Sequence, residues 1–102
     1  MEAVKVKTAS GVDLLADYDR PTDVLYVVLG APVPSEGEGQ PGGVELDFSL
    51  RDNSPCAVTI IGFNQNGWQK RRAELVKIIS RHLSIPTDSV AYVVNTAVTN
   101  HA

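Results

Sequence analysis

The segment that most constrains the fold of this 102-residue chain is the apolar run Val24–Leu29, which follows the polar turn 19–23. Only the hydroxyl of Tyr26 interrupts its apolar character. A strand that is apolar on both faces lies inside a sheet and is covered, at least in part, on both sides. Asp19, Pro21 and Asp23 suit a tight turn, because Pro presets φ and Asp side chains bond to nearby amides. The sequence therefore predicts a central strand at 24–29.

Four further segments have strand patterns. Residues 4–8, 12–18 and 44–50 alternate apolar and polar side chains, as half-buried strands do, although a short helix over 12–18 is an alternative. Residues 56–63 are apolar on both faces, and the short turn before them predicts an antiparallel hairpin with 44–50. The lysines within 4–8 are typical of an edge strand, because they oppose pairing with another chain.

One long helix is predicted over residues 67–82. Asn66 is a favourable N-cap, and Gln69 follows three residues later, as in a capping box. Ile85–Pro86 ends the helix. Its apolar stripe recurs at helical spacing through Trp68, Leu75, Ile79 and His82.

The C-terminal segment allows two interpretations. The β-branched and aromatic residues of 87–94 favour a final strand, and the alternative is a second short helix capped by Thr87 or Asp88. Residues 95–102 are predicted to form a frayed tail.

The segment 30–43 contains five glycines and three prolines in fourteen positions. No core can be built from it, so it is predicted to be a long mobile loop, either a connector or a functional lid. The length of the chain suits one domain over 1–102. The predicted fold is α+β: a mainly antiparallel sheet of four to five strands with one long amphipathic helix packed on a face.

Composition narrows the class of protein. The net charge of −3 makes nucleic-acid binding an unfavoured role. The single cysteine, Cys56, excludes an internal disulfide, and no apolar run reaches the ~20 residues of a membrane span. The N-terminus lacks the apolar region of a signal peptide, so we expect a cytoplasmic protein that does not enter a membrane. The charge is uneven, since residues 67–83 carry five basic residues and one acidic residue.

Three groups of side chains are candidate sites, and no cofactor is expected. Asp17, Asp19 and Asp23 crowd the first turn and are weak metal-ligand candidates, since oxygen ligands suit Ca²⁺ or Mg²⁺; turn formation explains them better. Cys56, His82 and His101 give neither a zinc site nor a Cys-His pair. The possible anion-binding or partner-binding helix face consists of Lys70, Arg71, Arg72, Lys77 and Arg81.

Residues 18–63 resemble the DUF2283 family of small domains of unknown function. The likeness runs through Tyr18-Asp19, the segment 23–29, Gly43–Phe48 and Val58–Phe63. This chain departs from the family in its longer N-terminal region, its Gly- and Pro-rich central segment and its C-terminal extension. Some genes of this family are associated with toxin-like partners, so the resemblance implies an antitoxin-like or other partner-binding role.

Residues 55–94 are similar, more locally, to the second half of the tautomerase fold, the fold of macrophage migration inhibitory factor. That family's catalysis uses a proline exposed after removal of the initiator methionine. Here Glu2 follows Met1, so the resemblance implies a chain without that nucleophile.

The sequence contains no recognisable catalytic constellation. Our leading hypothesis is a non-enzymatic interaction module, because one helix covers only one face of the sheet and a homodimer or a protein partner would cover the other. The alternative is a small-ligand or metal-binding domain, or a degenerate enzyme, with the segment 30–43 as a lid. The observation that would favour the alternative is a concave pocket beneath that segment with convergent polar groups.

Overall fold

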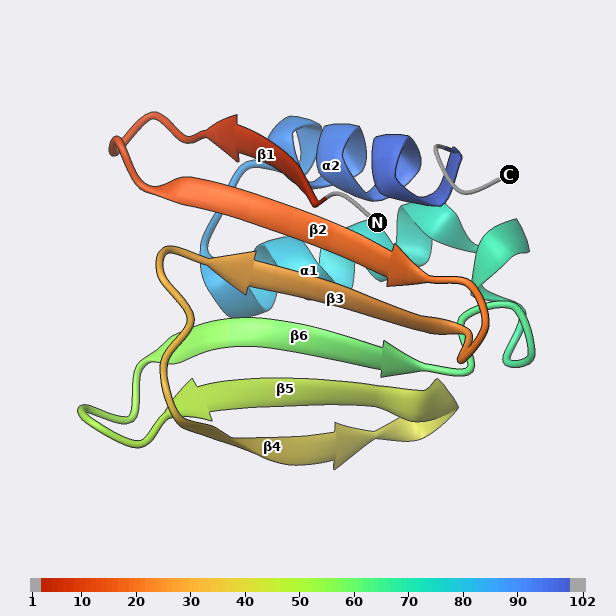
Figure 1. Cartoon of the computed structure of the whole chain (residues 1–102), viewed down its shortest axis with the longest axis horizontal. Helices are drawn as coiled ribbons and strands as arrows, with labels where there is room; N and C mark the ends of the chain where they lie inside the picture. The colour runs from red at the N-terminus through yellow and green to blue at the C-terminus, as the bar shows by residue number, and fades with distance from the viewer. Residues whose placement is uncertain (1–2, 100–102) are drawn as a thin grey trace.

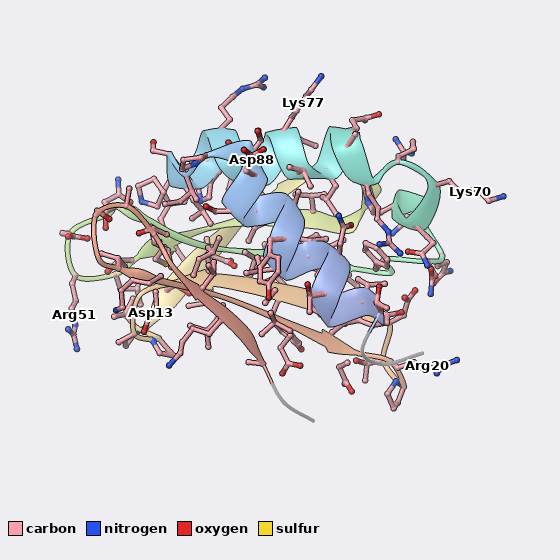
Figure 2. The ribbon with its side chains drawn as sticks, turned by 90° about the horizontal axis from the view of Figure 1, so that it is seen from above. Asp13, Arg20, Arg51, Lys70, Lys77 and Asp88 are labelled. Atoms are coloured by element: carbon pink, nitrogen blue, oxygen red, sulfur yellow. The ribbon has the colours of Figure 1, made fainter. Side chains whose placement is uncertain are left out.

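A computed structural model describes residues 3–99 of the chain. Within this range, six strands form one antiparallel sheet and two α-helices pack on the same face of it (Figures 1 and 2). The strands are β1 (Val4–Lys7), β2 (Asp13–Asp19), β3 (Val24–Leu29), β4 (Ser35–Gln40), β5 (Val44–Ser49) and β6 (Pro55–Ile61). The helices are α1 (Arg72–Leu83) and α2 (Thr87–Thr99), with short 3₁₀ turns η1 (Pro41–Gly43) and η2 (Trp68–Lys70).

The predicted α+β class and antiparallel sheet are confirmed, but the sheet has one strand more than the expected maximum and the chain has a second helix. The spatial order is β1-β2-β3-β6-β5-β4. The central place of β3 and the edge position of β1 are confirmed. So is the hairpin of β5 with β6, in which Val44 lies opposite Ile60 and Leu46 opposite Val58.

The prediction of a strand over 87–94 is wrong, because this segment begins helix α2. Its buried residues are spaced at i, i+3, i+4, i+7 and i+8, which is the period of a helix face rather than of a strand. That face packs on β2 and β1, so tertiary burial overrides the strand propensity of valine. The predicted frayed tail is helical as far as Thr99, and the rest of it lies outside the described residues. The buried face consists of Val90, Val93, Val94, Ala97 and Val98.

The prediction of a loop over the whole of 30–43 is also wrong, because Ser35–Gln40 forms the edge strand β4. Glycine is a poor strand former, but β5 offers a full row of backbone partners, and Gly42 and Gly43 adopt positive φ in the turn between the two strands. Every residue of β4 is exposed. The segment therefore contributes backbone pairing to the sheet and nothing to the core.

The predicted helix over 67–82 is confirmed in its main part, but its predicted capping box is not formed. A 3₁₀ turn, η2, precedes α1, and the N-cap position of α1 is Arg71, which makes no side-chain cap bond. The Asn66 side chain donates instead to the carbonyl oxygen of Ile61, 2.9 Å away. The left-handed Gly67, at φ 80°, separates this bond from the helix.

The core lies between the sheet and the two helices. Leu14, Leu25 and Ile60 contribute fully buried side chains from the sheet, and Leu75 and Val93 contribute them from the helices. The helices lie side by side behind the sheet in Figure 1, so the opposite face is left without a helical layer. No helix within residues 3–99 is long and apolar enough to cross a membrane.

Candidate functional site

Asp23 has a structural role in the first turn. Its backbone is left-handed, with φ 58°, and its carboxylate accepts hydrogen bonds from the Tyr18 hydroxyl at 2.7 Å and from the amides of Asn64 and Gln65 at 2.9 and 3.0 Å. Burial raises the pKa of this carboxyl, but the hydrogen bonds from Asn64, Tyr18 and Gln65 outweigh burial and hold the pKa below its usual range. These hydrogen bonds connect the turn between β2 and β3 to residues 64–65, which follow β6.

The three aspartates proposed as weak metal ligands are not gathered into a site. Asp17 and Asp19 lie on the strand face turned away from the helices, and Asp19 accepts a bond from the Thr22 hydroxyl. The Asp23 carboxylate faces residues 64–65 instead. Across residues 3–99, no group of three or more His, Cys, Asp or Glu side chains is placed to hold a metal ion.

The five basic residues of the predicted helix face are distributed over more than one surface. Arg71 and Arg81 line a groove between α1 and β5, whereas Arg72 and Lys77 line a second groove between α1 and α2. Lys70 lies on η2, and its side chain projects outward at the end of the molecule, away from Lys77 (Figure 2). The positive charge is therefore divided among three directions.

Cys56 and His82 lie near each other without forming a catalytic pair. Both contact the backbone carbonyl oxygen of Asp47: the Cys56 thiol donates to it at 3.6 Å, and the His82 Nε2 lies 3.0 Å from it. Because a carbonyl only accepts, Nε2 carries the hydrogen in that contact. Burial, with the Asp47 charge adding to it, raises the pKa of the Cys56 thiol, so the reactive thiolate is disfavoured. His101 lies outside the described residues.

The sheet face turned away from both helices, here called the open face, has an apolar centre. The Tyr26 side chain is 41% exposed and that of Ile61 is 52% exposed. The segment 31–33 crosses part of this face (Figure 1), where it borders a small hollow with Val28 and Ala57. A solvated sheet face is usually polar, so this centre is a candidate contact surface. Its members are Leu15, Val24, Tyr26, Val28, Ala57, Thr59 and Ile61.

Acidic side chains flank this apolar centre. On β5, the Glu45 carboxyl is hydrogen-bonded to that of Asp47, which raises the pKa of Glu45, with burial and the Asp47 charge adding to the effect. Asp47 is itself buried and accepts a bond from the Thr59 hydroxyl at 2.9 Å. Gly37 on β4 leaves room for Glu45, since a Cβ there would lie 2.2 Å from the Glu45 carboxylate. Two carboxyl groups are thus held together beside the apolar centre.

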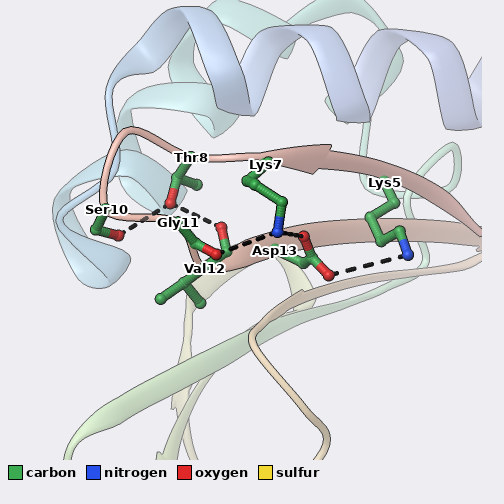
Figure 3. A network of polar contacts seen from close by, with 7 residues as sticks. All are labelled: Lys5, Lys7, Thr8, Ser10, Gly11, Val12 and Asp13. Atoms are coloured by element: carbon green, nitrogen blue, oxygen red, sulfur yellow. Dashed lines mark hydrogen bonds and ion pairs between the residues drawn. The ribbon is translucent and has the colours of Figure 1, made fainter.

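The two lysines of the open face are already engaged at its far edge. Figure 3 shows Lys5 and Lys7 of β1 reaching toward Asp13 of β2, with Nζ to carboxylate distances of 3.9 and 3.1 Å. The Lys7 Nζ also donates to the Gly11 carbonyl oxygen at 3.3 Å. These contacts join β1 to β2. Both lysines of the open face therefore pair with Asp13, and neither of them pairs with the carboxyls of β5.

On the helix side of the sheet lies the α1–β5 groove, which has a volume of about 550 Å³. Trp68 closes one end, where its Nε1 donates to the Gly42 carbonyl oxygen at 2.7 Å. The Arg71 guanidinium lies 4.1 Å from the centroid of the Trp68 ring. Arg81 and His82 lie along the same wall on α1, and Leu46 of β5 provides apolar floor.

Sequence reasoning identified the acidic positions of β5 as a solvated strand face and did not foresee their pairing. The alternation of 44–50 shows which face they share. It does not show that Gly37, which lies opposite Asp47 on β4, leaves room for the Glu45 side chain. Trp68 belongs to the predicted apolar stripe of the helix, and it also lines the groove. No family model matches the chain, and neither a curated protein nor a solved structure matches it.

Proposed function

We propose that this chain is a non-enzymatic protein-interaction module of the cytoplasm, whose open face binds a partner segment that is apolar in its centre and positively charged at its flanks. The observation that carries the proposal is the exposure of Tyr26 and Ile61 beside the Glu45–Asp47 carboxyl pair. The partner-binding role implied by the likeness to the DUF2283 family agrees with it.

The apolar centre supplies the attraction. Burying apolar surface stabilises an association by roughly 25 cal/mol per Å², and an exposed tyrosine offers a large, rigid contact area. Tyr26 and Ile61 lie on neighbouring strands, β3 and β6, so one partner element can cover both. Pairing of a partner strand with β1 or β4 at the edge of the sheet is a weaker alternative. Lysines on β1, and glutamates and glycines on β4, disfavour such pairing.

The charges favour a basic partner over a second copy of the chain. Within the described strands, the open face presents five carboxylates and two lysines, and both lysines already contact Asp13. The five are Asp13, Asp17, Asp19, Glu45 and Asp47. In a two-fold face-to-face dimer, β2 of one copy would lie over β2 or β5 of the other, and both strands present acids on this face. A cationic side chain from a partner would instead be attracted to the Glu45–Asp47 carboxyl pair.

The test uses two matched tyrosines. A photo-crosslinking residue, p-benzoylphenylalanine, replaces Tyr26 on the open face in one variant and Tyr92 in the other. Tyr92 is 56% exposed, on the outer side of α2. Each variant is irradiated in cells, and the covalent products are isolated and sequenced. We expect a product from the Tyr26 position alone, joined to a segment rich in Lys or Arg.

A synthetic peptide with the sequence of the joined segment then completes the test. We expect it to bind the purified chain, more weakly at high salt and not at all to the Ile61→Lys variant. A product containing only two copies of this chain would identify a homodimer and overturn the basic partner. Equal products from both tyrosines, or none from Tyr26, would overturn the assignment of the open face.

A further inference from the structure

We propose that the α1–β5 groove binds a small monocarboxylate with a flat apolar body. This site is independent of the open face, because the sheet separates the two. It lies beside Pro41 and Gly42, at the end of the Gly- and Pro-rich segment, next to which the sequence predicts a ligand pocket in the alternative hypothesis. The observations that support it are the volume of the groove, its apolar floor and an arginine without a partner.

The groove has the size and lining of a small-molecule site. Its volume of about 550 Å³ falls within the range of roughly 300–1,000 Å³ that is usual for ligand pockets. Leu46 and Ile78 are half-buried on its floor, and Pro41 and the Trp68 ring form its closed end. Such a lining favours a flat apolar body over a sugar or a hydrated ion.

Arg81 supplies the charge that a carboxylate needs. Among residues 3–99, no hydrogen bond or ion pair involves its guanidinium, although it lines the groove. Arg71 differs, because its Nη1 lies 3.3 Å from the Glu74 carboxylate and its Nη2 donates to the Asn66 carbonyl oxygen at 3.0 Å. The carboxylate is therefore placed at the Arg81 end, where a planar guanidinium can bind it with two parallel hydrogen bonds.

The local charge favours a monoanion over a phosphate dianion. Arg71 is balanced by Glu74, which leaves Arg81 as the one uncompensated full charge among the described groove residues. Phosphate sites usually combine backbone amides with several uncompensated cations, whereas one of the two arginines that line this groove, Arg71, is already paired with Glu74. At the other end, the Arg71 guanidinium stacked on Trp68 presents a flat surface on which an aromatic ring can lie.

The experiment is an NMR titration, because Trp68 is the only tryptophan and gives one indole N–H signal. The probe is 4-phenylbutyrate, and the matched compounds are 4-phenyl-1-butanol, which lacks the charge, and acetate and inorganic phosphate, which lack the apolar body. We expect saturable shifts of the Trp68 indole and of the Leu46 and Ile78 amides with 4-phenylbutyrate. The alcohol should bind at least about tenfold more weakly, because it loses a charge-assisted bond.

Two helix variants complete the test. Arg81→Gln should weaken 4-phenylbutyrate binding about tenfold, whereas Lys77→Gln, on the same helix but outside the groove, should leave it unchanged. Equal melting temperatures of both variants would show that the fold is retained. Equal affinity for the alcohol, tighter binding of inorganic phosphate, or no saturable shift would each overturn the proposal. Failure here leaves the open-face proposal unaffected, because Tyr26 crosslinking does not involve this groove.

Discussion

Replacing Asp23 by alanine should be the most damaging single change in the turn between β2 and β3. The carboxylate accepts bonds from the Tyr18 hydroxyl and from the amides of Asn64 and Gln65. At about 1 kcal/mol for each lost bond, the three together contribute about 3 kcal/mol. Alanine in the left-handed conformation, φ 58°, adds roughly 1 kcal/mol. We therefore expect a loss of about 4 kcal/mol, a large part of the stability of a domain of this size.

Urea unfolding of the alanine, glycine and asparagine variants of Asp23 separates the contribution of the carboxylate bonds from that of the left-handed backbone. Glycine accepts the left-handed backbone but lacks the carboxylate, so it should cost about 3 kcal/mol. Asparagine tolerates that conformation and keeps one acceptor oxygen, so it should cost about 1–2 kcal/mol. Glu38→Ala, which removes an exposed carboxylate from β4, is the control and should change the free energy of unfolding by less than about 0.5 kcal/mol.

The pH dependence gives a second check on the same reasoning. The folded pKa of Asp23 lies below its usual range, so its contribution is present above the ordinary pKa and disappears as the pH falls through the folded value. The difference in stability between wild type and Asp23→Asn should therefore shrink in strong acid. Equal stabilities of the alanine and asparagine variants at neutral pH would refute the assignment of the bonds to the carboxylate.

Two further predictions concern the backbone and Tyr18. Gly43→Ala should destabilise the chain by more than about 1 kcal/mol in urea, because its Cβ would lie 2.0 Å from the Ile61 carbonyl oxygen at φ 77°, whereas Gly39→Ala, which meets open space, should be neutral or slightly stabilising. Burial, the bond to Asp23 and the charge of Asp23 raise the pKa of Tyr18 to about 12. Its contribution to stability is therefore complete below about pH 10 and is lost between about pH 10 and 12, and Tyr18→Phe should remove that slope from the unfolding free energy; an unchanged slope would contradict it.

The strands β1, β2 and β3, the β5–β6 hairpin and α1 were predictable because their signals are local. Alternation over 44–50 places Val44 and Leu46 on the buried side, and the stripe through Leu75 and Ile79 gives the buried face of α1. The turn at 19–23 was also predictable, but not its long-range function. Nothing near Asp23 in sequence indicates that its carboxylate binds the amides of residues 64–65.

β4 and α2 were missed for opposite physical reasons. β4 has the composition of a loop, and its strand form depends on the pairing of its backbone with β5, which no property of its own side chains reveals. In α2, the strand propensity of the valines hid a helical stripe that continues through Ala97 and Val98, beyond the window that suggested a strand. Because α2 lies beside α1, both helices cover the same side of the sheet, and the open face has no helical layer.

Asp47 is the residue at which the two proposed surfaces meet. Its side chain lies on the open face with Glu45 and Thr59, whereas its carbonyl oxygen receives His82 from the groove side. The β-bulge between Asp47 and Phe48 interrupts the regular pairing of β5 with β6 at this position. A substitution at Asp47 would therefore disturb both surfaces at once and could not assign a function to either. Tyr26 and Arg81 are the informative positions, because each lies on one surface alone.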